Sequence, residues 1–175
     1  LVKYTGWNNK GTQYFIELVA VDGVQKINGN YYLFQNKTLQ FFTGVVKNNE
    51  GQWVHLKNGK SDFSFTGFSK SIQNNRWYFS RNGILDWSFT GVAKSIADNK
   101  WYHAKNGELD WNFSGLSKSI QNGKWYFSRS GKLDWSFTGV AKSIANNKWY
   151  HAKNGALDWY FTGVSKSVQN GKWYF

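Results

Sequence analysis

The 175-residue chain contains no cysteine, no proline and no methionine. The absence of cysteine excludes disulfide bonds and thiol chemistry, and it leaves the redox compartment open. No apolar run approaches the roughly 20 residues that a membrane-spanning helix needs, so we expect no membrane insertion. No signal peptide is visible, but the chain begins at Leu1 without a methionine. We therefore expect an excised fragment of a larger protein, for which that absence carries little weight.

Acidic residues are few: ten Asp and Glu stand against 22 Lys and Arg, for a formal charge of +12. Half of these acids recur once per repeat along the array, and such acids do not form the converging pair of carboxylates that a glycosidase needs. Without cysteine or clustered acids there is no metal-ligand spacing, and neither a phosphate-binding glycine loop nor a nucleophile elbow is present. The sequence therefore predicts no enzyme, no metal and no cofactor.

The chain is organised as a tandem repeat of 24 residues. Each unit begins with a tryptophan, and these lie at Trp53, Trp77, Trp101, Trp125, Trp149 and Trp173. A constant period in this range indicates a repeat array. We interpret residues 53–175 as five regular repeats plus a closing strand, and residues 1–52 as diverged repeats that cap the same continuous domain.

Each unit has the pattern of β-hairpins, and no segment shows a helical period. Asn-Gly favours tight hairpin turns because both residues adopt positive φ, and it occurs at two places in the unit, for example Asn106-Gly107 and Asn122-Gly123. In Leu-Asp-Trp-x-Phe, strict alternation places Leu85, Trp87 and Phe89 on one face, which favours a core role for the tryptophan. A single hairpin is marginal in water, so stacked hairpins are expected to share aromatic faces. We predict an all-β solenoid of tandem hairpins.

A second period of 48 residues lies over the first. The third residue of the unit alternates between histidine and phenylalanine, at His55, Phe79, His103, Phe127, His151 and Phe175. A face that accepts both residue types is expected to be half buried. Two accounts stay open: a two-hairpin block was duplicated, which is the simpler account, or successive hairpins have alternately different surroundings.

Aromatic residues make up 20% of the chain, so rings must supply much of the buried surface, and each ring is also a potential ligand platform. Flat rings beside polar groups suit stacking on sugar rings. The candidate ligand-binding pairs are Trp77 and Tyr78, Trp101 and Tyr102, Trp125 and Tyr126, and Trp149 and Tyr150. A possible second wall, in competition with the core role above, comprises Trp87, Trp111, Trp135 and Trp159.

One lysine per unit forms a further ladder. Its members are Lys70, Lys94, Lys118, Lys142 and Lys166. Two interpretations compete: a solvated stripe that discourages edge-to-edge aggregation, or a track for a polyanionic polymer in which many weak contacts add up. An aspartate also recurs once per unit, at Asp62, Asp86, Asp110, Asp134 and Asp158. It is expected to make a local contact with a turn or a lysine, or to accept a hydrogen bond from a sugar hydroxyl.

The motif Trp-Tyr-Phe-x-x-x-Gly-x-Leu, followed by Thr-Gly and later by Asn-Gly-Lys-Trp-Tyr-Phe, resembles the cell-wall-binding repeat superfamily. That group includes choline-binding modules of Gram-positive autolysins and phage lysins, glucan-binding repeats of glucansucrases, and C-terminal repeats of large clostridial toxins. The likeness covers roughly residues 5–175. It implies a non-catalytic β-solenoid on a secreted or surface protein, with ligands held by aromatic side chains between consecutive hairpins.

In choline-binding modules the cage combines the Trp-Tyr pair with a tryptophan directly after Thr-Gly, and it holds quaternary ammonium by a cation–π interaction. This chain matches the pair, but at the other wall only Trp7 keeps the tryptophan. The sister positions hold Phe68, Val92, Leu116, Val140 and Val164. The resemblance therefore leaves the ligand open, and Trp87 with its counterparts is the candidate replacement wall.

These observations lead to several functional hypotheses. The first is a carbohydrate- or cell-wall-binding module that anchors a secreted protein to a bacterial envelope, with wall polysaccharide, teichoic acid or another glycan as partner. The second is a structural stalk or adhesin segment without a ligand. Docking to host glycans, as in the toxin-like repeats, stands between the two. Single-stranded nucleic acid, which also binds basic grooves with stacking aromatics, ranks last.

Overall fold

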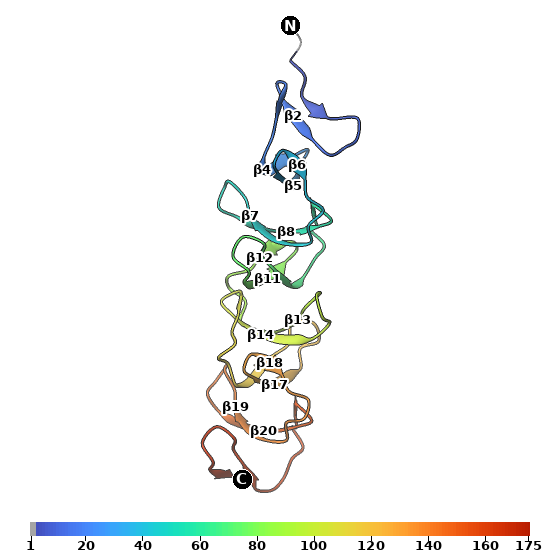
Figure 1. Ribbon diagram of the computed structural model, residues 1–175. Coiled ribbons are helices and arrows are strands. Elements are labelled where there is room, and N and C mark those ends of the chain that lie inside the picture. The colour runs from blue at the N-terminus through green and yellow to red at the C-terminus, as the bar shows by residue number, and fades with distance from the viewer. Residues whose placement is uncertain (1–2) are drawn as a thin grey trace. The chain divides into compact units, whose positions relative to one another are not determined.

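The computed structural model describes residues 3–175, which contain β-strands and turns but no α-helix. This part of the chain therefore has no helix that could cross a membrane. The chain divides into two compact units, residues 1–86 and 87–175, and each is described by itself (Figure 1). The predicted all-β array of tandem hairpins is confirmed within both units. The predicted boundary at residue 52 remains a prediction.

The first unit holds twelve short strands. They are β1 (Gly6–Trp7), β2 (Tyr14–Ile16), β3 (Val19–Ala20), β4 (Gly23–Ile27), β5 (Asn30–Gln35), β6 (Thr38–Leu39), β7 (Gly44–Lys47), β8 (Trp53–Lys57), β9 (Lys60–Ser61), β10 (Gly67–Lys70), β11 (Trp77–Arg81) and β12 (Ile84–Leu85). From β4 onward they form triplets, each a long hairpin followed by a two-residue strand that pairs back on its second member. The irregular segment β4–β6 thus has the same strand plan as the regular repeats.

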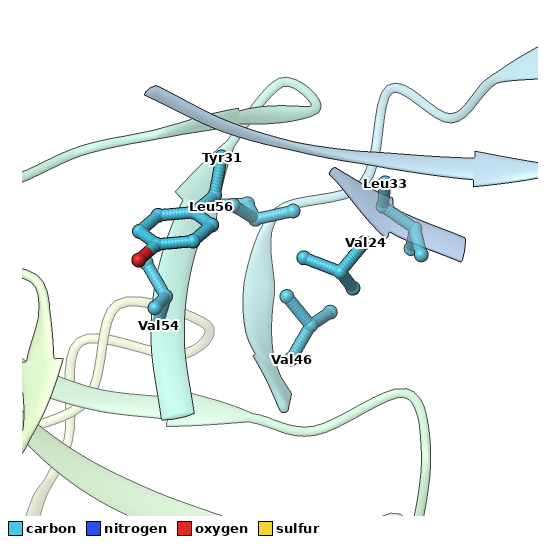
Figure 2. Packing of buried hydrophobic residues seen from close by; sticks show 6 residues of the cluster. All are labelled: Val24, Tyr31, Leu33, Val46, Val54 and Leu56. Carbon is cyan, nitrogen blue, oxygen red and sulfur yellow. The ribbon is translucent and has the colours of Figure 1, made fainter. Parts of the chain in front are cut away.

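One core cluster of the first unit is mainly aliphatic. Figure 2 shows Val24 and Val46 facing each other. Leu33, Val54, Leu56 and Tyr31 complete this cluster, and each side chain in it is at least nine-tenths buried. The cluster joins one triplet to the next, as expected when hydrophobic faces are buried only by stacking neighbours.

The second unit continues the triplets. Its strands are β13 (Gly91–Lys94), β14 (Trp101–Lys105), β15 (Glu108–Leu109), β16 (Gly115–Lys118), β17 (Trp125–Arg129), β18 (Lys132–Leu133), β19 (Gly139–Lys142), β20 (Trp149–Lys153), β21 (Ala156–Leu157), β22 (Ser165–Lys166) and β23 (Trp173–Tyr174). Within a triplet, Lys94 lies opposite Trp101 and Ala104 opposite Leu109. Parallel bridges from Val92 to Ser119 and from Leu116 to Ser143 join consecutive hairpins, so the hairpins stack in chain order.

The two Asn-Gly positions form different turns. Asn106 and Gly107 have φ of 51° and 74°, as predicted for a tight two-residue hairpin turn. The prediction is wrong for Asn122-Gly123, where only Gly123 has positive φ. There Ser119 donates its amide hydrogen to the Lys124 carbonyl at 2.8 Å, and four residues lie between them. We call this longer loop, residues 119–124 and its counterparts, the hairpin tip.

The Leu-Asp-Trp-x-Phe segment is not a continuous alternating strand, which corrects the prediction. Strand β15 ends at Leu109, and the Phe113 amide donates to the Asp110 carbonyl at 3.3 Å, which closes a turn. The turn brings Trp111 to the surface, where 54% of its area is exposed, and the same fraction holds for Trp87 and Trp135. A core role for these tryptophans is therefore wrong.

The alternating histidine and phenylalanine position is fully buried from His55 to Phe127, not half buried as predicted, whereas His151 is partly buried and Phe175 is exposed. His103 and Phe127 are each 0% exposed, and His103 stacks on Phe113 with ring centroids 3.6 Å apart. The Nδ1 atom of His103 lies 2.9 Å from the Ser117 hydroxyl, fourteen residues ahead. The position fourteen residues after Phe127 is Ala141, in the same apolar cluster. Alternate hairpins therefore have different surroundings, polar beside histidine and apolar beside phenylalanine.

Candidate functional site

The aromatic residues of consecutive triplets meet in a regular order in the second unit. Trp101 contacts Tyr126 of the next triplet with centroids 6.2 Å apart, and Tyr126 contacts Trp135 of its own triplet at 5.4 Å and 75°. One step later, Tyr150 and Trp159 repeat the edge-to-face contact at 5.7 Å and 72°. The hairpins thus bring together one tryptophan from one triplet with a tyrosine and a tryptophan from the next.

Trp125, Tyr150 and Trp159 line a pocket of about 100 Å³. All three were predicted as ligand-binding residues, from the Trp-Tyr pairs and from the second wall. The remaining lining residues are Leu116, Ser143, Asn146 and Leu157. Since a water in liquid occupies about 30 Å³, the pocket has room for a small group of a few heavy atoms.

Leu116 occupies the position after Ser-Gly at which the resembled cages carry a tryptophan. In this chain Leu116 lines the pocket with an aliphatic side chain. Trp159, which follows strand β21, supplies an aromatic ring to the same pocket. Sequence reasoning did not identify Ser143 and Asn146. Their signal was available: a serine and an asparagine or aspartate recur every 24 residues in the hairpin tips.

The tip residues fix the pocket tyrosine and its counterpart in the preceding triplet. Asn146 donates from Nδ2 to the Tyr150 hydroxyl at 2.8 Å, and its Oδ1 accepts the Lys148 amide at 3.0 Å. Asn122 makes the same two bonds to Tyr126 and Lys124. A side chain held from both ends has little rotamer freedom left to lose, so the pocket wall is formed before any ligand arrives.

The other predicted aromatic residues are distributed between the units. In the first unit, Tyr78 is 3% exposed, packs at 5.1 Å on Trp53 and accepts a hydrogen bond from Asn74, while Trp77 is half buried. In the second unit, Tyr102 contacts Trp111 at 5.7 Å, and Trp149 stacks on Tyr174 at 4.8 Å. Trp87 is exposed at the start of that unit.

The lysine ladder lies beside these rings. Lys70, Lys94, Lys118, Lys142 and Lys166 are all exposed, and each stands opposite the leading tryptophan of its hairpin. A second basic residue ends each tip, at Arg76, Lys100, Lys124, Lys148 and Lys172. Sequence reasoning did not recognise this second row as part of a site.

The net charge of the second unit is concentrated on its tips. Residues 87–175 contain twelve basic and five acidic side chains. The four tips, each taken together with the ladder lysine that precedes it, hold eight of those basic residues but only Asp98 among the acids. The tips therefore carry a formal charge of +7, and the remainder of the unit is neutral. Such a surface attracts anionic polymers.

The recurring aspartates have local partners. Arg129 donates to Asp134 at 2.8 Å, and the Ser136 hydroxyl donates to the same carboxylate at 2.5 Å. The bonds from Ser136 and Arg129 hold the pKa of Asp134 below its usual value. Asp110 and Asp158 each accept the backbone amide two residues ahead. Asp158 lines a hollow next to His151, and Asp110 lines another hollow with Trp87 and Lys105.

The histidines do not form a metal centre within the described residues, where no group of three His, Cys, Asp or Glu side chains converges. Burial lowers the pKa of both His55 and His103 to about 4. Both are therefore neutral at physiological pH. Their roles are packing and hydrogen bonding inside the array.

No protein-family model and no curated protein matches the chain. Several solved structures are similar to it. CbpJ of Streptococcus pneumoniae TIGR4 is 22% identical over 98% of this chain and 58% of its own, with a TM-score of 0.38. Choline binding protein F of S. pneumoniae is 25% identical over 83% of this chain and 47% of its own, with a TM-score of 0.34.

Alternansucrase in complex with isomaltononaose is 21% identical over 89% of this chain and 12% of its own, with a TM-score of 0.38. The chain thus spans about half the length of the two pneumococcal proteins and a small part of the alternansucrase. Choline-binding proteins, one of the groups that the repeat motif resembles, are among the structures similar to this chain.

Proposed function

We propose that this chain is a non-catalytic binding module that attaches a larger secreted protein to a polymer of the bacterial cell wall or to a surface glycan. One observation carries the proposal: the aromatic pocket formed by Trp125, Tyr150 and Trp159 between consecutive hairpins. Its rings and its tip asparagine combine an apolar face with a fixed polar group, which is the usual composition of a small-ligand site.

The pocket suits a part of a polymer unit better than a whole free ligand. A volume of about 100 Å³ accommodates one face or one substituent of a sugar, or a compact cationic head group held by the rings. Each such contact is weak. Repetition of the aromatic arrangement along the chain then converts weak contacts into useful avidity when the ligand is itself a repeating polymer.

The basic tips extend the site toward anionic polymers. The lysines opposite each leading tryptophan place positive charge next to the rings, and the eight basic tip residues of the second unit outnumber the single acid there. Teichoic acids, which are phosphate-rich wall polymers, are the partner class that satisfies both features. We place the module outside the cell, on the wall or cell surface.

The test is a pull-down of the full chain on purified Gram-positive cell walls, before and after removal of teichoic acids, with free choline and α-glucan as competitors. Trp159→Ala should weaken wall binding about three- to tenfold, as expected for the loss of one aromatic contact. Tyr160→Ala is the matched control, because Tyr160 is 93% exposed beside Trp159 and does not line the pocket.

A second pair of variants tests the tips. Lys100, Lys124 and Lys148 changed together to Gln should reduce binding and flatten its dependence on salt, because the tip charges attract the polymer. Lys57, Lys105 and Lys153 changed to Gln remove the same charge away from the tips and should bind as the parent does. Equal binding by all variants, or no binding by the parent, would refute the module and favour a ligand-free stalk.

A further inference from the structure

One hairpin tip differs from the others at the residue that contacts the pocket tyrosine. Four residues before the tyrosine, the tips of the second unit carry Asn122, Asn146 and Asn170, but the first tip carries Asp98. All four side chains contact the tyrosine hydroxyl of their own triplet, at 2.8 Å for each asparagine and 2.5 Å for the aspartate. The exchange therefore changes the chemistry of the site but not its geometry.

The direction of the hydrogen bond is fixed at the asparagine sites. The Lys124 amide donates to Asn122 Oδ1 at 3.1 Å, so Oδ1 must be the atom that faces the backbone. The amide group Nδ2 then faces the Tyr126 hydroxyl and donates to it. A hydroxyl that accepts this bond keeps its own proton to donate. The asparagine sites thus present a proton donor to a ligand.

At the first tip this direction is reversed. The Lys100 amide donates to Asp98 Oδ1 at 3.1 Å, as in the sister tips. The other carboxylate oxygen has no proton at neutral pH, so the Tyr102 hydroxyl must donate to it. Desolvation raises the pKa of Asp98, but the bonds from Tyr102 and Lys100 outweigh it and leave the pKa below its usual value. This site presents a negative charge and acceptors.

The tyrosine–tryptophan contact of the reversed site matches that of its sisters. Trp111 lies edge-on to Tyr102 at 5.7 Å and 78°, and 54% of Trp111 is exposed to a ligand. Lys94 and Lys100 flank this tip as Lys118 and Lys124 flank the next one. The tip lysines are common to both kinds of site, so Asp98 alone changes the charge of the tip. On the neighbouring strand Lys132 lies opposite Tyr102, where the counterpart opposite Tyr126 is Ala156.

We propose that the Asp98 site selects a protonated amine, such as the ammonium group of an amino sugar without an acetyl group, whereas the asparagine sites take neutral or anionic acceptors. The ammonium donates to the Asp98 carboxylate while the sugar face lies on Trp111. The inference rests on the proposed function, because it assigns a ligand class to one of the aromatic sites. An array with both kinds of site would bind a polymer that carries both amines and acceptors.

The experiment follows the indole N–H signals of ¹⁵N-labelled full-length chain by NMR, with glucosamine and N-acetylglucosamine as probes at a pH where glucosamine is protonated. The Trp111 signal is assigned by its loss in Trp111→Phe, and the Trp135 signal by its loss in Trp135→Phe. In the parent, Trp111 should respond to glucosamine at about three- to fivefold lower concentration than to N-acetylglucosamine, the contribution of one exposed charge pair.

Two reciprocal substitutions use the sister tips as controls. Asp98→Asn should remove the preference for glucosamine at Trp111, and Asn122→Asp should create it at Trp135. Each variant has a side chain that a neighbouring tip already accommodates, so both should unfold close to the parent temperature. A preference at Trp111 that survives Asp98→Asn would overturn the assignment.

The proposed function and this inference fail in different ways. If a wall polymer shifts the Trp135 and Trp159 signals but Trp111 shows no preference for the amine, only the inference is wrong. If no polymer and neither probe shifts any of the three signals, both are wrong.

Discussion

At the scale of single residues, the buried histidines make stability depend on pH. Burial lowers the pKa of His103 from 6.5 to about 4, so the folded chain keeps this ring neutral while the unfolded chain protonates it below pH 6.5. The contribution of the neutral His103 ring to the free energy of unfolding is therefore complete above about pH 6.5, and it is lost as the pH falls toward 4. His55 behaves in the same way.

We expect the free energy of unfolding to fall by about 2 kcal/mol per buried histidine between pH 7 and pH 5, measured by urea denaturation. The variant His103→Phe with Ser117→Ala and Ala104→Ser gives this triplet the residues of its phenylalanine sister. The free energy of unfolding of this variant should fall less between pH 7 and pH 5 than that of the parent, because one titrating histidine has been removed. The same acid sensitivity in the variant and the parent would contradict this explanation.

The burial of these residues could not be predicted from the local pattern. The alternation of His and Phe suggested a half-buried face, because a lone histidine has a polar nitrogen to satisfy. The partner is Ser117, fourteen residues ahead, and only the stacking of hairpins brings it to 2.9 Å. A partner in the next hairpin leaves no signal within the strand that contains His103.

At the scale of the strand and the turn, the repeat predicted which segments pair, and the chemistry of each turn determined where the predictions failed. Asn106-Gly107 forms the expected tight turn, with positive φ at both residues. Asn122-Gly123 does not, because Asn122 Oδ1 accepts the Lys124 amide and holds a longer loop. The same local bonding around Asp110 turns Trp111 outward, which a two-residue alternation does not predict.

The glycines of the two turns should therefore differ in tolerance. Gly131 and Gly123 have nearly equal φ, 71° and 69°, so alanine is strained by about 1–2 kcal/mol at either position. A Cβ on Gly131 would also lie 2.3 Å from the Asp110 carbonyl oxygen, whereas at Gly123 the nearest atom is the Lys118 Cε at 3.9 Å. The clash should add about 1–3 kcal/mol to the loss in Gly131→Ala.

Urea denaturation of Gly131→Ala and Gly123→Ala measures the difference directly. Equal losses of stability in the two variants would show that the Asp110 backbone moves aside, and that the close approach at the tight turn is not a constraint.

The candidate site was predictable in its rings but not in its polar part. The aromatic residues stood out by number and period, and three of them line one pocket. Asn146 and Ser143 were missed because tip residues of this type usually stabilise only their own turn. Asn146 does both: it closes the turn through Lys148 and orients Tyr150.

At the scale of the molecule, a histidine and the serine that it contacts both belong to the same 24-residue unit, which runs from one leading tryptophan to the next. His103 and Ser117 belong to residues 101–124, and Phe127 and Ala141 belong to residues 125–148. Removal of residues 125–148 therefore keeps both hydrogen-bonded pairs, His55 with Ser69 and His103 with Ser117. Removal of residues 107–130, also 24 in number, places Ala141 where His103 requires Ser117.

We expect the chain without residues 107–130 to be less stable than the chain without residues 125–148 by about 1–3 kcal/mol, the cost of a buried polar atom without a partner. Urea denaturation at neutral pH compares the two deletions, which match in length and in the number of triplets removed. If both are equally stable, the serine is dispensable to the buried ring.

The hydrogen bond between His103 and Ser117 thus has a consequence for the history of such a chain. Tandem repeats gain and lose copies by unequal crossing-over between misaligned genes, and the outcome depends on where in the repeat the crossover lies. Crossovers at the codons of a hairpin tip yield arrays whose buried pairs stay matched. A crossover at the codons of an Asn-Gly turn separates the histidine at the junction from its serine, so selection should favour copy-number change through the tips.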